Sequence, residues 1–169
     1  MEGILPDRYG VSLFNLGAGA AKDISIEWKF AIGDIVRQTN QLSQRSFAES
    51  YFQHDTSKQT LSLEAKTGLR ATYFLKNDLH SRHDYILPCS IENKGHKVFL
   101  PGSYIDLVSS YLYLAFAQKE TPQDLDDSLF EIEAFCKVCY SRRFKLRSEL
   151  MVYRSSEPPA FDALLVPVA

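Results

Sequence analysis

One stretch of sequence decides the fold: Asp23-Ile24-Ser25-Ile26-Glu27-Trp28-Lys29-Phe30-Ala31-Ile32. Its even-numbered positions carry Ile, Trp or Phe, whereas its odd-numbered positions are polar apart from Ala31. Successive side chains of a β-strand point to opposite faces, so this period of two predicts a half-buried antiparallel strand. Trp28 stands in the inward row and is expected to be buried between two sheets.

Further strands are predicted on both sides of this one. The segments are 9–16, 59–65, 69–75, 85–92, 96–100, 130–140, 144–152 and 161–168. Aromatic residues are plentiful, with 11 Phe and 9 Tyr, and flat rings pack well on a pleated surface. Strands separated by turn signals predict a mainly β chain, an antiparallel Ig-like β-sandwich, with a partly open β-barrel as the alternative.

One or two short helices are expected in the long connections. Gly33 to Thr56 breaks the strand pattern and spaces its apolar residues at imperfect helical intervals, which favours some helix there. Ser103 to Gln118 favours a second helix with Ser103 as its cap, although its half from Tyr111 to Ala117 would also suit a strand. Asn77 to Asp84 is polar and predicts a loop.

Composition narrows the class of protein. The length of 169 residues suits one domain, so residues 1–169 are interpreted as a single β-rich domain. A net charge of -2 gives no overall field to concentrate a polyanion, so nucleic acid is not an expected partner. Three cysteines do not make a disulfide framework, and no segment predicts a membrane helix or an export signal. These features favour a cytoplasmic chain, or a piece excised from a longer membrane-tethered protein.

The most basic region is the C-terminal hairpin, with Arg142, Arg143, Lys145 and Arg147. Such a group could bind an anionic ligand such as a nucleotide, which would make the chain a sensor or effector domain. Glu131, Glu133 and Glu149 lie on the same hairpin. Pairing of opposite charges across the strands therefore explains the basic residues without any ligand, and it is the favoured interpretation.

A second candidate is the pair His80 and His83, with Asp78 and Asp84 nearby in the sequence. Histidine and aspartate together can bind zinc or a similar ion, and this segment is where an enzyme site would be sought. The spacing is not the i, i+4 spacing of a helical zinc pair, and no glutamate base accompanies it. A solvated loop is the favoured interpretation, and no cofactor is predicted.

Two short sequence motifs resemble binding sites, but the strands predicted at these positions are incompatible with both kinds of site. Cys136-Lys137-Val138-Cys139 has the C-x-x-C spacing, but residues three apart on a strand point to opposite faces. Gly17-Ala18-Gly19 has the composition of a phosphate-binding loop, which requires a following helix, whereas a strand is predicted next. With no convergent reactive set, the first hypothesis is a non-enzymatic domain that binds a protein partner or a small ligand.

The segment from Leu13 to Ile24 resembles an element found in many uncharacterised bacterial proteins. It reads Leu13-Phe14-Asn15-Leu16-Gly17-Ala18-Gly19-Ala20-Ala21-Lys22-Asp23-Ile24. In those proteins a short strand ends in an Asn-x-Gly-x-Gly-x-Ala turn and enters a strand carrying a Trp. The resemblance implies a β-sandwich domain that is often membrane-anchored, here through a segment absent from this chain. It implies no activity, and this sequence departs from it in having Ala20 where proline is common.

Overall fold

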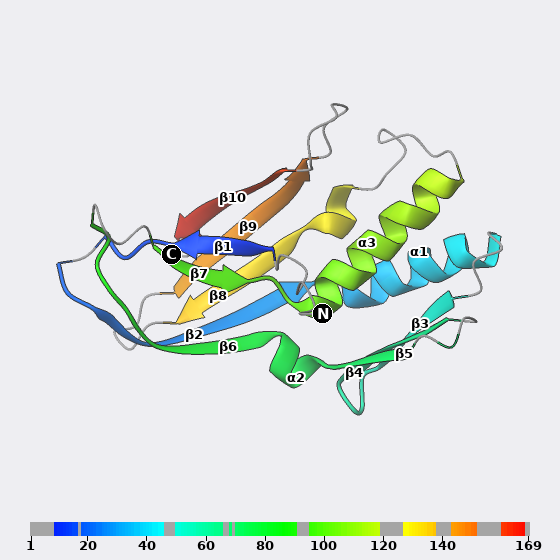
Figure 1. Cartoon of the computed structure of the whole chain (residues 1–169), viewed down its shortest axis with the longest axis horizontal. Coiled ribbons are helices and arrows are strands. Elements are labelled where there is room, and N and C mark those ends of the chain that lie inside the picture. Colours follow the sequence, from blue (N-terminus) through cyan, green and yellow to red (C-terminus); the bar gives the residue numbers. More distant parts are fainter. Residues whose placement is uncertain are drawn as a thin grey trace, which may run out of the picture.

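The computed structural model describes residues 9–16, 18–45, 50–65, 68, 70–90, 95–118, 127–137, 143–151 and 160–167. For residues 50, 127, 128, 143–151 and 160–167 that description covers the backbone alone. Within these ranges the chain forms three antiparallel sheets and two long helices (Figure 1). The predicted mainly β class is confirmed.

The largest sheet has the strand order β10-β9-β8-β2-β6. Its strands are β2 (Ala21–Phe30), β6 (His80–Ile86), β8 (Ile132–Lys137), β9 (Arg143–Met151) and β10 (Ala160–Pro167). β2 pairs with both β6 and β8, and its inward residues Ile24, Ile26 and Trp28 are only 2 %, 2 % and 3 % exposed. The inward row predicted from the period of two is therefore confirmed over Ile24, Ile26 and Trp28, whereas the strand ends at Phe30 and Ile32 is the first residue of a helix, α1 (Ile32–Arg45).

A two-stranded ribbon covers part of this sheet. It consists of β1 (Gly10–Leu13) and β7 (His96–Phe99), which are antiparallel. Apolar side chains of the ribbon and of the sheet line a gap of only about 10 Å³; they are Val11, Leu13, Val98, Ile26, Trp28, Ala134 and Cys136. Trp28 is thus buried between two sheets, and the described strands form a sandwich-like arrangement of open sheets rather than a closed barrel.

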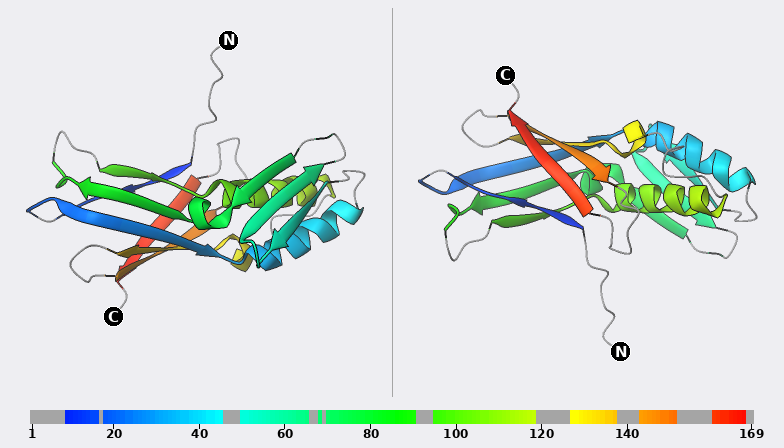
Figure 2. Two further views of the ribbon diagram at one scale, coloured as in Figure 1. Left: turned by 90° about the horizontal axis from the view of Figure 1, so that it is seen from below. Right: turned by 90° about the horizontal axis from the view of Figure 1, so that it is seen from above.

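The third sheet supports the helices. It has the order β3 (Ser50–Asp55), β4 (Thr60–Ala65), β5 (Arg70–Phe74), and α1 (Ile32–Arg45) and α3 (Gly102–Ala117) lie on one of its faces (Figure 2). Asn40 of α1 joins the layers, because its Nδ2 donates to the Phe52 carbonyl and its Oδ1 accepts from the Phe52 amide, both at 2.8 Å. The predicted connection with some helix is therefore α1 followed by β3, a strand that the sequence pattern did not show.

The polar loop predicted over Asn77 to Asp84 was wrong. The structure places there the end of α2 (Leu75–Asp78) and most of β6, whose His80, Arg82 and Asp84 are exposed. β6 is an edge strand of the five-stranded sheet, and polar side chains on an exposed edge hide the strand pattern. The strand predicted over 85–92 therefore begins earlier, at His80, and it ends at Ile86.

The helix predicted after Ser103 is confirmed as α3, but its cap is different. Pro101 occupies the cap position, and the backbone amides of Gly102 and Ser103 donate to Asp78 Oδ1 and Oδ2, each at 3.0 Å. The Ser103 hydroxyl is fully buried and has no hydrogen-bond partner among the described residues. The Asp78 carboxylate therefore accepts the first amides of α3 in place of the Ser103 side chain. This contact connects the start of α3 to the end of α2.

Candidate functional site

An open groove of about 240 Å³ lies where the third sheet meets β6. We call it the α2 groove, and its lining residues are His54, Thr56, Gln59, Leu75, Lys76, Leu79 and His80. They come from the end of β3, the β3–β4 turn, α2 with the Leu79 that follows it, and the first position of β6. One of the two predicted metal ligands, His80, therefore lies in a groove that the sequence did not predict.

The α2 groove combines side chains that can donate hydrogen bonds with an apolar surface. Lys76 brings an ammonium group, His54 and His80 bring imidazoles, and no carboxylate or thiol is among its described lining residues. Leu75 and Leu79 supply the apolar part. Such a set can hold an anionic group at its polar wall and a less polar group against the leucines.

The walls of the groove are held together by the backbone. The Leu75 amide of α2 donates to the Gln59 carbonyl of the β3–β4 turn at 2.9 Å. Gln59 has a φ of 50°, a left-handed conformation that closes the turn before β4. The turn and α2 are therefore fixed relative to each other, as a preformed ligand site requires.

Besides Asp78, whose carboxylate accepts the two amides at the start of α3, two carboxylates adjoin the lining residues, and each is engaged elsewhere. Asp55 follows His54 in the chain; the Ser57 hydroxyl and then the Lys58 amide donate to it and lower its pKa to about 2. Glu27 is the strand partner of His80, and its Oε1 lies 3.3 Å from Lys29 Nζ. Both negative charges thus have cationic or donor partners outside the groove lining.

The second predicted metal ligand, His83, is brought to His96 rather than to His80. His83 Nδ1 lies 2.9 Å from His96 Nε2, and the two rings meet edge to face with centroids 4.5 Å apart. His80 and His83 are three positions apart on β6, so their side chains leave opposite faces of the strand. Nowhere among the described side chains do three or more His, Cys, Asp or Glu residues gather closely enough to hold a metal ion.

The basic hairpin is described only in part. Arg142 lies outside the described residues, and Arg143, Lys145 and Arg147 lie on β9 opposite Lys137, Phe135 and Glu133 of β8. The register thus places an acidic residue opposite Arg147, the arrangement that charge pairing across strands requires. An anionic ligand at the hairpin stays a prediction.

The structure describes the two motif-like segments only in part. Cys136 is half-buried on β8, and burial raises the pKa of its thiol, which disfavours the reactive thiolate. Cys139 and Gly17 lie outside the described residues. β2 begins at Ala21, so a strand follows the glycine-containing segment, as expected.

Comparison with protein-family models, curated proteins and solved structures finds no match to this chain. None of the helices in the described ranges combines the length and the apolar composition needed to cross a bilayer. The fold and the α2 groove therefore define the protein only by class: a mainly β, sandwich-like domain with a donor-rich groove.

Sequence reasoning missed most of the groove. His54, Thr56 and Gln59 fall in or beside a segment interpreted as a connection, and Lys76 precedes the supposed polar loop. No spacing in the sequence links these positions, because the groove exists only where the β3–β4 turn packs against α2. The one available signal was the polar composition around His80.

Proposed function

We propose that this protein is a non-enzymatic binding domain that takes a small ligand with an anionic group in the α2 groove. The observation that carries the proposal is the lining itself, in which Lys76, His54 and His80 converge without a carboxylate among the described residues. The proposal agrees with the expected binding domain and moves the expected anionic ligand from the basic hairpin to this groove.

The arrangement favours binding over catalysis. Nucleophilic catalysis pairs a hydroxyl or thiol with a base that is itself oriented by a third group. Within the described residues, no hydrogen bond links His54 or His80 to such a partner. Donors that surround an open volume without an activated nucleophile can recognise an anion but have no group prepared to attack it.

The size and polarity of the groove limit the ligand. About 240 Å³ is slightly below the range typical of drug-sized ligand sites, roughly 300–1,000 Å³, so the bound part is small. The ammonium and the imidazoles suit a phosphate or carboxylate, and Leu75 and Leu79 suit a flat or apolar body attached to it. A phosphorylated or carboxylated small molecule satisfies both requirements.

The test is calorimetric titration with inorganic phosphate, a nucleoside monophosphate and the matching uncharged nucleoside. We expect the monophosphate to bind more tightly than either fragment, because it alone uses both the donors and the leucines. Binding should also raise the melting temperature by mass action. Equal affinity for the nucleoside and the monophosphate would rule out an anion site in the groove.

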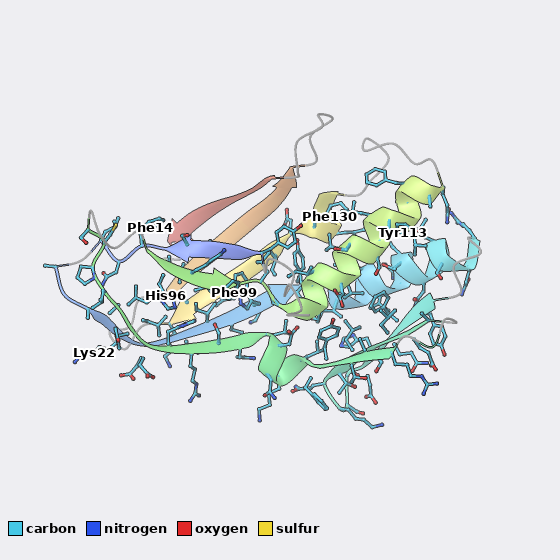
Figure 3. The ribbon with its side chains drawn as sticks, in the orientation of Figure 1. Phe14, Lys22, His96, Phe99, Tyr113 and Phe130 are labelled. Carbon is cyan, nitrogen blue, oxygen red and sulfur yellow. The ribbon has the colours of Figure 1, made fainter. Side chains whose placement is uncertain are left out.

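Replacing Lys76 with glutamate is expected to weaken binding of the monophosphate at least tenfold, about 1.4 kcal/mol or more, because an attractive charge becomes repulsive. The control is Lys22→Glu, which changes the net charge equally on an exposed lysine far from α2 (Figure 3). The Lys22 variant should bind like the wild type in the same titration. A similar loss in both variants would show that overall charge, not the α2 groove, governs binding.

A further inference from the structure

His83 and His96 form a polar contact between the β1–β7 ribbon and the edge of the five-stranded sheet. His83 lies on β6 and His96 on β7, and both side chains are half-buried. The imidazole nitrogens are 2.9 Å apart, and Figure 3 shows His96 on the ribbon beside β6. The contact therefore joins two sheets whose strands are not paired, apart from an isolated bridge between Asn15 and Pro88 beyond the ends of β1 and β6.

A direct imidazole–imidazole hydrogen bond limits the protonation states of the pair. One nitrogen must carry the hydrogen, and the other must keep its lone pair. Whichever ring donates, one added proton on the other nitrogen of the donor ring leaves the bond intact. A second proton on the acceptor nitrogen removes its lone pair and places two cations against each other.

We propose that this His83–His96 pair is a pH-dependent clamp, closed near neutral pH and opened by double protonation in acid. Opening would lift the β1–β7 ribbon from the sheet and expose the apolar side chains beneath it. An isolated two-stranded ribbon is marginally stable in water, so it depends on its contacts with the sheet. Those contacts include the small apolar gap in which Val11, Leu13 and Val98 face Trp28.

The surroundings set the direction of the pH dependence. Burial lowers the pKa of His83, the neighbouring His96 lowers it further, and Asp84 on the same strand raises it. The strand partners of the pair, Ile24 on β2 and Leu13 on β1, do not titrate, and neither does Ser81, whose Oγ lies 3.3 Å from His83 Nε2. Because the closed form holds His83 with fewer protons than the open form, closure is favoured above the ordinary histidine pKa of about 6.5 and is lost below it.

Hydrogen exchange and tryptophan fluorescence test the clamp on the whole chain. Trp28 is the single tryptophan and lies beneath the ribbon, so its emission reports exposure of the gap. Between pH 7.5 and 5, we expect exchange in β1 and β7, corrected for the intrinsic rate, to accelerate by up to about tenfold per pH unit for each proton taken up. Trp28 emission should shift to the red over the same interval, while exchange in β4 stays unchanged.

Variants separate the clamp from general acid sensitivity. His83→Gln removes the imidazole whose protonation breaks the contact, so the acid-dependent part of ribbon exchange should disappear, whatever the exchange rate at pH 7.5. His96→Gln also prevents the double charge, but burial still lowers the pKa of His83, so the acid-dependent part should shrink without disappearing. His80→Gln removes a histidine from the same strand but outside the pair, and it should keep the wild-type pH dependence. The clamp is refuted if ribbon exchange is independent of pH in the wild type, or if the full wild-type pH dependence persists in His83→Gln or in His96→Gln.

Discussion

Replacing Trp28 with alanine is expected to lower the free energy of unfolding by about 3–5 kcal/mol, the usual cost of removing a buried aromatic side chain. The Trp28 side chain is 3 % exposed and lies between the ribbon and the five-stranded sheet. Few atoms can move into the space it leaves, because β2 is paired on both sides. Urea denaturation followed by circular dichroism measures the loss.

A loss of this size is comparable with the total stability of many domains, so a second variant is needed. Trp28→Phe keeps an aromatic ring and should cost less than Trp28→Ala while leaving a measurable transition. Tyr113→Ala is the control, since Tyr113 is 70 % exposed on α3 and should change stability by no more than about 0.5 kcal/mol (Figure 3). Equal stability of Trp28→Ala and the wild type would refute the burial of this residue.

Replacing Asp78 with alanine is expected to lower the free energy of unfolding by about 2–3 kcal/mol. Its carboxylate accepts the amides of Gly102 and Ser103 at the start of α3, and a negative charge there also interacts favourably with the helix dipole. Loss of the carboxylate would leave two partly buried donors without their acceptors. Thermal and urea denaturation both report the change.

The control for Asp78 is a second aspartate in the first turn of a helix. Among the described side chains Asp34 of α1 pairs with Arg37, and both are more than half exposed, at 55 % and 65 %. Solvent-exposed pairs of this kind contribute little, so Asp34→Ala should cost no more than about 0.5 kcal/mol. If the two alanine variants lost equal stability, the Asp78 contact between α2 and α3 would contribute no more to folding than an exposed ion pair.

Local patterns predicted the parts of the fold that depend on one segment at a time. The alternation around Trp28 predicted β2 and its inward face. The segment 130–140 was predicted as a strand, and within it β8 buries Ile132 and Ala134 in the core. Ser103 to Gln118 was predicted to favour a helix, with a strand left open for Tyr111 to Ala117, and α3 is helical over both halves. These predictions needed no knowledge of which other segment lies opposite.

Prediction failed where the neighbour decides the structure. β6 is rich in polar residues because it is an edge strand, so its sequence resembled a loop. Ser103 has the side chain of a helix cap, yet Asp78 reaches the α3 amides from another element. Neither outcome contradicts the local preferences; the tertiary contacts simply supplied a better-placed partner.

By itself, the sequence determined a mainly β chain with Trp28 in the core and no short motif of known chemistry. Only the tertiary structure decided that His80 joins Lys76 in the α2 groove while His83 joins His96 on the ribbon. Two histidines three residues apart look like one cluster in a sequence. On a strand they point in opposite directions, so each one belongs to the segment packed against its own face.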